Sequence, residues 1–258
     1  MAVAPRRLSV ATYNIHKGFP VTPLFGRRPS LRALREELHA LNPDLVFLQE
    51  VLGAHAGHAR RHRDWPVQSQ YEYLADTLWQ SHAYGRNAVY DAGHHGNALL
   101  SCYPITRWDN EDVSAHRFES RGLLHCEIAV PDWPQTLHCV CVHLALTVRG
   151  RSRQLERLRQ RIERLVPADA PLIVAGDFND WTWRQRATQE FAQPLNMHEV
   201  FELAGGQTAR SFPAALPLLR LDRIYVRGFR VHAARVHHGR RWARLSDHAP
   251  LIADLERI

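Results

Sequence analysis

The chain has 258 residues, of which 45% are hydrophobic, and it carries a formal charge of +7. That length is enough for a large core, and no stretch approaches the roughly 20 apolar residues of a membrane-spanning helix. The short, broken apolar stretch after Arg6 and Arg7 also argues against a signal peptide, so we expect one domain over residues 1–258, located in the cytoplasm.

The positive charge favours an anionic partner, either nucleic acid or anionic phospholipid. Lys17 is the only lysine, and every other basic residue is arginine. A GC-rich genome produces such a ratio without any selection for binding, so the charge does not choose between the two partners. The four cysteines lack Cys-x-x-Cys spacing and are expected to be buried, reduced thiols.

Hydrophobic periodicity predicts strands and helices that follow one another along the chain. In chain order we expect a strand at 8–14, a helix at 31–41 with Ser30 as its N-cap, a strand at 45–48, a helix at 71–80, strands at 97–101, 123–130 and 136–143, a helix at 155–165, a strand at 172–175, a helix at 184–193, and strands at 223–226, 230–236 and 250–255. Strands this frequent, with helices between them, imply helices packed outside one or more sheets.

Polar residues stand at or just past the ends of several apolar runs. They are Asn14, Glu50, His143, Asp177 with Asn179, and Asp247 with His248. Each alone has a structural explanation, as a turn residue, an acid at a helix start or a core histidine. Because strand ends on one rim can converge on a cleft, the set as a whole predicts a phosphoryl-transfer site that uses a hard cation.

Five segments resemble the motifs of the endonuclease/exonuclease/phosphatase superfamily, in the order in which that family has them. They are Thr12–Ile15, Gln49–Val51, Gly176–Asn179, Leu221–Ile224 and Ser246–Pro250. The superfamily includes pancreatic-type deoxyribonuclease, abasic-site endonucleases, neutral sphingomyelinases and inositol polyphosphate 5-phosphatases. The resemblance implies an α/β (α+β) fold, a four-layer αββα sandwich with two central mixed sheets flanked by helices.

The resemblance also implies a divalent cation, Mg²⁺ or Mn²⁺. Glu50 is expected to be its main ligand, because a hard cation prefers carboxylate oxygen. Asn14 is expected to lie beside Glu50 and to touch phosphate or cation-bound water. Asp247 is expected to be an accessory metal or hydrogen-bond ligand.

The catalytic residues implied by the resemblance surround the phosphate. Asp177 is expected to orient the attacking water, and Asn179 to donate to a phosphate oxygen. His248, with Asp222 bonded to its other ring nitrogen, is expected to act on the phosphate or as general base. His143 is expected to contact the phosphate from the opposite side.

His143 stands where abasic-site endonucleases of this family usually have tyrosine, which argues against that activity. The closest resemblance is to bacterial, intracellular members with segments like Gly96–Ser101 and Arg121–His125. The sequence therefore identifies the kind of bond that is cut more sharply than it identifies the substrate.

We expect a nuclease that hydrolyses DNA phosphodiester bonds. Arg149 and Arg151 are predicted to meet flanking phosphates, and Trp181 to stack on bases; Trp183 is a further stacking candidate. Residues 53–64, rich in histidine and arginine, are predicted to form a mobile basic loop over the phosphate entry, with a second metal site as the alternative. Other hypotheses are a phospholipid or small-molecule phosphodiesterase or phosphatase, and a catalytically inactive binding domain.

Overall fold

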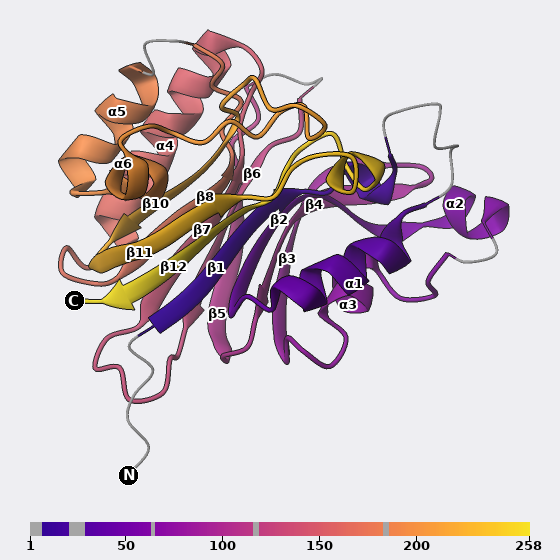
Figure 1. Cartoon of the computed structure of the whole chain (residues 1–258), viewed down its shortest axis with the longest axis horizontal. Coiled ribbons are helices and arrows are strands. Elements are labelled where there is room, and N and C mark those ends of the chain that lie inside the picture. Colours follow the sequence, from indigo (N-terminus) through magenta and orange to yellow (C-terminus); the bar gives the residue numbers. More distant parts are fainter. Residues whose placement is uncertain (1–6, 21–28, 63–64, 116–118, 183–185) are drawn as a thin grey trace.

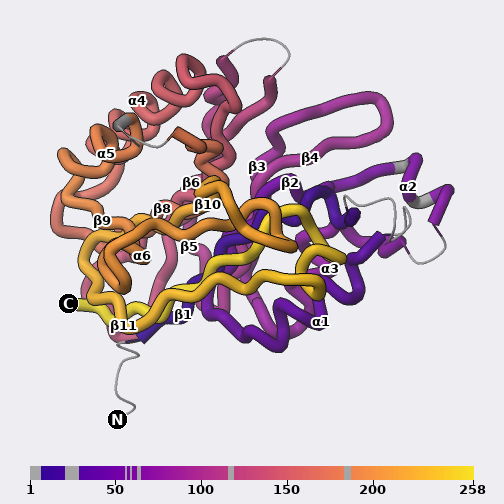
Figure 2. The backbone as a smooth tube through the Cα atoms, turned by 45° about the horizontal axis from the view of Figure 1, so that its top comes forward, coloured from indigo at the N-terminus to yellow at the C-terminus, as the bar shows by residue number. Residues whose placement is uncertain are grey.

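Two six-stranded mixed β-sheets pack face to face, and helices cover their outer sides (Figure 1). The structure is a computed structural model of the chain and describes residues 7–20, 29–62, 65–115, 119–182 and 186–258. The four layers confirm the architecture that the resemblance implied. In the tube view of Figure 2, α4 and α5 lie on one side of the molecule and α1 on the other.

The first sheet is built from both ends of the chain. Its strand order is β11 (Phe229–Val236), β12 (Leu251–Arg257), β1 (Arg7–Asn14), β2 (Leu45–His55), β4 (Gly93–Ser101) and β3 (Ser81–Tyr90). Helices α1 (Leu31–Leu41) and α3 (Gln70–Ala75) pack on its outer face, and α2 (Ala56–Arg61) follows β2. Short 3-10 turns are η1 (His16–Gly18) and η4 (Trp242–Arg244).

The second sheet comes from the middle of the chain. Its strand order is β5 (Ile105–Asp112), β6 (Gly122–Ile128), β7 (Leu137–His143), β8 (Leu172–Asp177), β10 (Asp222–Arg227) and β9 (His198–Glu199). Helices α4 (Val148–Leu165) and α5 (Arg186–Ala192) cover its outer face, followed by the turn η3 (Gln193–Leu195). Helix α6 (Val200–Gly205) packs at the edge, against β10 and β11.

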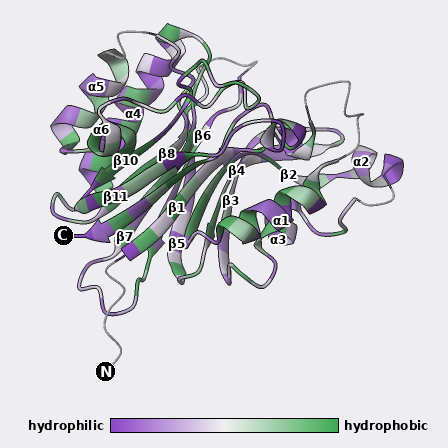
Figure 3. Cartoon of the chain, viewed as in Figure 1, coloured by the Kyte–Doolittle hydropathy of each residue, from purple (hydrophilic) through white to green (hydrophobic). Residues whose placement is uncertain are grey.

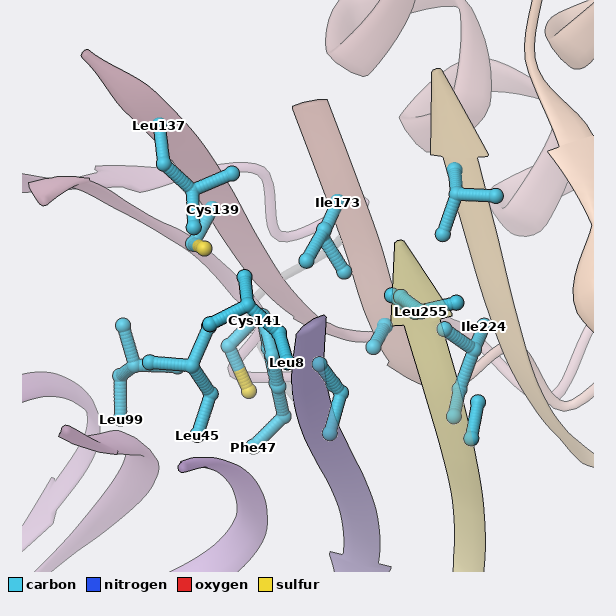
Figure 4. Close-up of a cluster of buried hydrophobic side chains, with 14 of the residues drawn as sticks. Leu8, Leu45, Phe47, Leu99, Leu137, Cys139, Cys141, Ile173, Ile224 and Leu255 are labelled. Carbon is cyan, nitrogen blue, oxygen red and sulfur yellow. The ribbon is translucent and has the colours of Figure 1, made fainter. Parts of the chain in front are cut away.

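Successive side chains of a strand point to opposite faces of its sheet. Both faces are apolar here, because one packs on the other sheet and the other on helices. On β1, Leu8 and Val10 face the other sheet, whereas Ala11 and Tyr13 face the helices. The inter-sheet cluster is shown in Figure 4, and Figure 3 shows hydrophobic residues concentrated on the central strands. All four cysteines are free thiols, and three of them are fully buried, in accord with the sequence prediction.

Several elements differ from the sequence prediction. β2 runs seven residues past the predicted end and β4 begins earlier, while β3, β5 and β9 are additional strands. β5, with the sequence ITRWDNED, is an edge strand whose side chains are mostly exposed, so it lacks the apolar run that predicts a strand. α3 ends at Ala75, because Asp76 adopts a left-handed φ of 44°. Ser30 stands at the N-cap of α1, but its hydroxyl contacts the Gly18 and Leu245 carbonyls.

Candidate active site

Four strands, drawn from both sheets, carry a polar residue at one end, on the inner side of the sandwich. Asn14 ends β1, His143 ends β7, Asp177 ends β8, and Asp222 begins the antiparallel β10. Each lies an even number of residues from an apolar side chain of the inter-sheet cluster, so strand alternation turns all four toward the other sheet. The polar residues therefore continue the buried inner faces at one edge of the molecule.

Strand register brings these side chains into contact with Asp177. His143 and Asp222 are the Cα partners of Asp177 on the two neighbouring strands. From the other sheet, Asn14 Nδ2 donates to Asp177 Oδ2 over 3.1 Å, and His143 Nε2 lies 3.5 Å from the same oxygen. The structure thus brings together, around one buried carboxylate, residues that the sequence places more than 160 positions apart.

The turn after β8 requires unusual backbone conformations. Gly176 has φ 149°, and a Cβ at this position would lie 1.9 Å from the Val142 carbonyl oxygen, so only glycine lets β8 approach β7 so closely. Asn179 has a left-handed φ of 50°. Its N–H donates to Asp177 Oδ1 and its Nδ2 to the Leu144 carbonyl, both over 2.9 Å. These bonds fix the orientations of the Asp177 and Asn179 side chains.

His248 enters the cluster from the loop before β12. Its Nδ1 lies 2.7 Å from Asp222 Oδ2, and its Nε2 lies 3.8 Å from Asp177 Oδ2. The Ser246 hydroxyl accepts the His248 N–H over 3.3 Å and donates to the Asn14 carbonyl over 2.7 Å. The loop is therefore tied to β1, and the ring of His248 lies between two carboxylates.

Burial and neighbouring charges shift the pKa values of His248, Asp177 and His143 in different directions. Burial alone would lower the pKa of His248, but the charges of Asp222 and Asp177 raise it to about 10. Burial raises the pKa of Asp177 to about 7 against the opposing effect of His248. Burial and the positive charge of Arg121 hold the pKa of His143 well below its usual range. Near neutral pH, His248 is therefore a protonated donor and His143 is neutral.

Glu50 lies at an irregularity of β2. Alternation alone would place it with Leu48, against the helices, but the register with β4 shifts between Leu48 and Val51, and Glu50 has φ 56°. Its carboxylate lies 3.4 Å from the Lys17 ammonium. Burial would raise the pKa of Glu50, but the neighbouring His143 ring and the Lys17 ammonium lower it to about 2. Glu50 is therefore ionised at any working pH.

The residues expected to hold a divalent cation lie around one edge of the first sheet. Asn14 is the Cα partner of Gln49, which directly precedes Glu50. The Ser246 hydroxyl lies 2.7 Å from the Asn14 carbonyl oxygen and 3.3 Å from Asp247 Oδ1. An ionised carboxylate with a second carboxylate and a carboxamide forms the oxygen donor set of a hard cation. The residues present therefore fit an ion of the Mg²⁺ type.

A second group of metal-ligand type is also found among the described residues. Asp177, Asp222 and His248 each offer one ligand atom, and these atoms lie within 4.8 Å of one another. His248 is protonated between the two carboxylates, and an imidazolium has no lone pair left for a metal. This group could hold a cation only with His248 neutral, so the described residues offer two candidate cation sites, this cluster and the Glu50 region.

Arg151 does not reach the surface, and its predicted contact with substrate phosphate is corrected. Its side chain is buried, with Nη1 donating to the Ala145 and Leu146 carbonyls and Nη2 lying 3.4 Å from Asp180 Oδ1. Arg223 approaches the other oxygen of Asp180 to 3.8 Å. Because the buried Asp180 carboxylate needs these cations, Arg151 holds together the loops that follow His143 and Asp177.

Replacement of Arg151 by methionine should destabilise the fold. Breaking one arm of this buried network is expected to cost about 2–3 kcal/mol, measured by urea unfolding. Arg153→Met is the matched control, because Arg153 is exposed on the same helix, and it should shift stability by less than about 0.5 kcal/mol. Equal stabilities of the two variants would contradict the structural role of Arg151.

Exposed side chains follow the site residues of β7 and β8 along the chain. Arg149 is exposed near the start of α4, and Trp181, two residues past Asn179, is 54% exposed. Trp183 lies outside the described residues. Trp181 lines a small hollow together with Leu218 and Arg220. The rim therefore combines a flat aromatic ring and cations with exposed leucines.

Residues 53–64 form regular structure where they are described, which corrects the predicted loop. β2 continues to His55, and α2 follows it. The His55 and His58 rings lie 3.8 Å apart between centroids, and Phe19 stacks on Trp65 at 5.8 Å. Among the described residues, these histidines do not form a cluster of metal-ligand atoms.

Sequence reasoning assigned no role to several residues that hold the site. Asp180 follows the Asp-x-Asn pair directly, and Ser246 directly precedes Asp247, so adjacency to a motif was the available signal. The signal for Lys17 was that it is the only lysine, because a single lysine among arginines can mark a position that needs an ammonium group.

The four-layer sandwich and the polar side chains at its edge are those of a phosphoesterase fold. The sequence matches the Endonuclease/Exonuclease/phosphatase family over residues 11–248, and the chain belongs to that family. Protein YbhP of Escherichia coli (strain K12) is 48% identical over 246 residues, which are 95% of each chain. Proteins of Escherichia coli O6:H1 and Shigella flexneri match to the same extent.

Solved structures with low sequence identity share the fold. D. rerio TDP2 humanized by 14 mutations has a TM-score of 0.72 at 22% identity, over 97% of this chain and 99% of that one. TDP2 of the same species has also been solved with a single-strand DNA product, with a TM-score of 0.68 at 21% identity and the same coverage. Bacteroides thetaiotaomicron mannosyl-6-phosphatase Bt3783 has a TM-score of 0.71 at 16% identity, over 96% of this chain and 99% of that one. These neighbours differ in substrate, so the likeness leaves the substrate open.

No helix in the described part of the chain is long and apolar enough to cross a membrane.

Proposed function

We propose that the protein is a divalent-cation-dependent phosphodiesterase that hydrolyses DNA. One observation carries the hydrolytic assignment: the buried Asp177 carboxylate contacts Asn14 of one sheet and His143 of the other, beside the paired Asp222 and His248. A turn or a core does not require this set. It does suit a reaction in which a water is oriented and negative charge on phosphoryl oxygens is neutralised.

Each side chain has a distinct part in the proposed reaction. Ionised Asp177 accepts a hydrogen bond from the attacking water and takes its proton. Protonated His248 donates from Nε2 to a non-bridging phosphate oxygen, while Asp222 fixes its ring through Nδ1. Neutral His143 donates to the phosphate from the side of β7. Asn179, oriented by its bond to the Leu144 carbonyl, donates its remaining amide hydrogen.

The structure favours one of the two roles open to His248. A ring protonated at neutral pH cannot take a proton from water, so the general base falls to Asp177. Glu50, with Asn14 and Asp247, would hold Mg²⁺ or Mn²⁺, which when bound neutralises charge on the phosphoryl oxygens.

The pH dependence of kcat/KM follows from these two groups. Asp177 has a raised pKa, so activity should rise through pH of about 7 as the carboxyl loses its proton. Activity should fall near pH 10 as His248 loses its proton. Asp222→Asn should move the alkaline fall to lower pH, because the charge of Asp222 is the main contribution that raises the pKa of His248. An alkaline limb unmoved in this variant would contradict the assignment of His248.

DNA is supported by the rim and by the overall charge. Arg149 is exposed and follows His143 closely in the sequence, and the exposed ring of Trp181 suits stacking on a base. The net charge of +7 favours a polyanion. A structural neighbour, D. rerio TDP2, has been solved with a single-strand DNA product.

Anionic phospholipid is a second candidate, because the same rim exposes apolar side chains. Leu146, Val148, Leu216 and Leu218 are each more than half exposed. Exposed apolar groups interspersed with arginine are typical of surfaces that contact lipid. Both substrates place a phosphodiester at the site, so the chemistry is common to the two candidates.

Side-by-side assays separate the candidates. The protein with Mg²⁺ is incubated with plasmid DNA, single-stranded DNA, RNA and vesicles of anionic phospholipid. Trp181→Ala is expected to raise KM for single-stranded DNA about 5- to 100-fold through lost stacking. Leu203→Ala, an exposed apolar residue of α6, should leave KM unchanged. Cleavage of phospholipid without cleavage of any nucleic acid would overturn the DNA assignment. If none of these substrates is hydrolysed, the protein would be a catalytically inactive binding domain.

A further inference from the structure

Lys17 stands apart from every other basic residue of the chain. The sequence has 33 lysines and arginines, and Lys17 is the only lysine. Its ammonium lies 3.4 Å from the Glu50 carboxylate, and its side chain is 41% exposed. Arginine would grip a carboxylate with two parallel hydrogen bonds, whereas lysine presents a compact charge on a flexible stem. A lysine here favours an ion pair that can open.

The backbone that carries Lys17 is held in a rare conformation. His16, Lys17 and Gly18 have φ values of 44°, 58° and 74°, so three consecutive residues are left-handed. Such a conformation is costly for residues other than glycine, and it persists only where the surroundings enforce it, most often at functional sites. The strain is therefore a reason to ask what the Lys17 side chain does.

Neighbouring groups lock this turn against the site. The His16 N–H donates to Asn14 Oδ1 over 3.1 Å, which ties the turn to a proposed cation ligand. The buried Gln70 donates to the Lys17 carbonyl and accepts the N–H of Leu52, both over 2.8 Å. The turn is thus fixed to both β1 and β2. The backbone is rigid, while the end of the Lys17 side chain reaches the solvent.

One permanent cation, Lys17, and several imidazole rings surround the Glu50 carboxylate. Lys17, His16, His95 and His143 all act on the Glu50 carboxylate, and Lys17 is the nearest permanent cation. His95 also has a buried Nδ1 without a hydrogen-bond partner among the described residues. These hydrogen-bond donors outnumber the single carboxylate among them, and the donors that it leaves unpaired suit a bound anion.

We propose that Lys17 is a phosphate-binding residue, whose ammonium alternates between Glu50 and a non-bridging oxygen of the substrate phosphate. This inference rests on the proposed function, which brings a phosphate and a divalent cation to the same place. A divalent cation on Glu50 competes with Lys17 for one carboxylate. The displaced ammonium then has the phosphate as its nearest anion, and a flexible lysine can make that move from a fixed turn.

Two substitutions give opposite expected effects on cation binding. Lys17→Met removes the competing charge at similar length and should tighten Mg²⁺ binding about 3- to 10-fold, while weakening binding of inorganic phosphate about 10- to 100-fold. Lys17→Arg should weaken Mg²⁺ binding, because arginine holds Glu50 more firmly. Both keep a side chain at the left-handed position, so the backbone strain stays the same. Arg32→Met, an equal charge change on the exposed start of α1, is the control and should alter neither affinity.

A single lysine allows a direct observation. Reductive methylation with ¹³C-formaldehyde labels Lys17 and the chain's α-amino group, and the Lys17 resonance is the one absent from Lys17→Arg. Mg²⁺ alone should shift this resonance, and inorganic phosphate added in the presence of Mg²⁺ should shift it again. A resonance unmoved by phosphate, or phosphate binding by Lys17→Met as tight as by the unaltered protein, would overturn the proposal.

The titration is independent of turnover. If the unaltered protein hydrolyses no phosphodiester while phosphate still shifts the Lys17 resonance, the proposed function fails and the phosphate-binding role of Lys17 stands. If hydrolysis depends on Mg²⁺ and the resonance does not respond to phosphate, the proposed function stands and the role of Lys17 fails.

Discussion

Asp177→Asn is expected to lower kcat about a thousand-fold, with the protein folded. The amide keeps the shape of the carboxylate and can still accept the bond from Asn14, but it cannot take a proton from water. Because burial raises the pKa of Asp177 to about 7, the ionised form is costly to bury. At alkaline pH the variant should therefore be as stable as the unaltered protein, or more stable.

Two measurements accompany this prediction. Initial rates with bis-p-nitrophenyl phosphate give kcat, and thermal unfolding shows that the variant is folded. Asp254→Asn, a half-buried carboxylate of β12 that pairs with Arg235, is the matched control and should retain its rate. If the Asp177→Asn protein hydrolyses the substrate as fast as the unaltered protein, the proposed mechanism is wrong.

Glu50→Gln is expected to have the second large effect, by removing the dependence of activity on Mg²⁺. The neutral amide is a much weaker ligand for a hard cation than the ionised carboxylate. We expect the rate at any attainable Mg²⁺ concentration to fall about a thousand-fold, close to the rate with excess chelator. Calorimetric titration with Mg²⁺ should show weaker binding.

Glu127→Gln is the control, a partly exposed glutamate of β6 near Arg107. It should leave both the rate and Mg²⁺ binding unchanged. If Glu50→Gln keeps its response to Mg²⁺, the cation must bind elsewhere. The cluster of Asp177, Asp222 and His248 would then be the cation site, and His248 would have to be neutral to serve as a ligand.

The convergence of most candidate site residues was predictable from the sequence. Asn14, His143 and Asp177 each end an apolar run, and a strand with two buried faces leaves room for polar side chains only at its ends. Strand alternation then turns them inward. The contacts of Asp177 with Asn14 and His143 depend on pairing between distant strands, which a single sequence does not determine.

The remaining parts depended on backbone detail and tertiary partners. The β-bulge that turns Glu50 toward Lys17 leaves no mark in hydrophobic periodicity. Arg151 follows Arg149 by two residues on an arginine-rich helix, and nothing local shows that Asp180 lies opposite it. Edge strands such as β5 are missed for a related reason, because exposed side chains remove the apolar pattern.

Hydrolysis of bis-p-nitrophenyl phosphate titrated with Mg²⁺, run in parallel on the unaltered protein and on Asp177→Asn, tests the central claim most directly. We predict release of p-nitrophenol that saturates with Mg²⁺, is abolished by chelator and is about a thousand-fold slower in the variant. Release that does not depend on Mg²⁺, or that is equally fast in both proteins, would contradict a phosphodiesterase centred on Asp177.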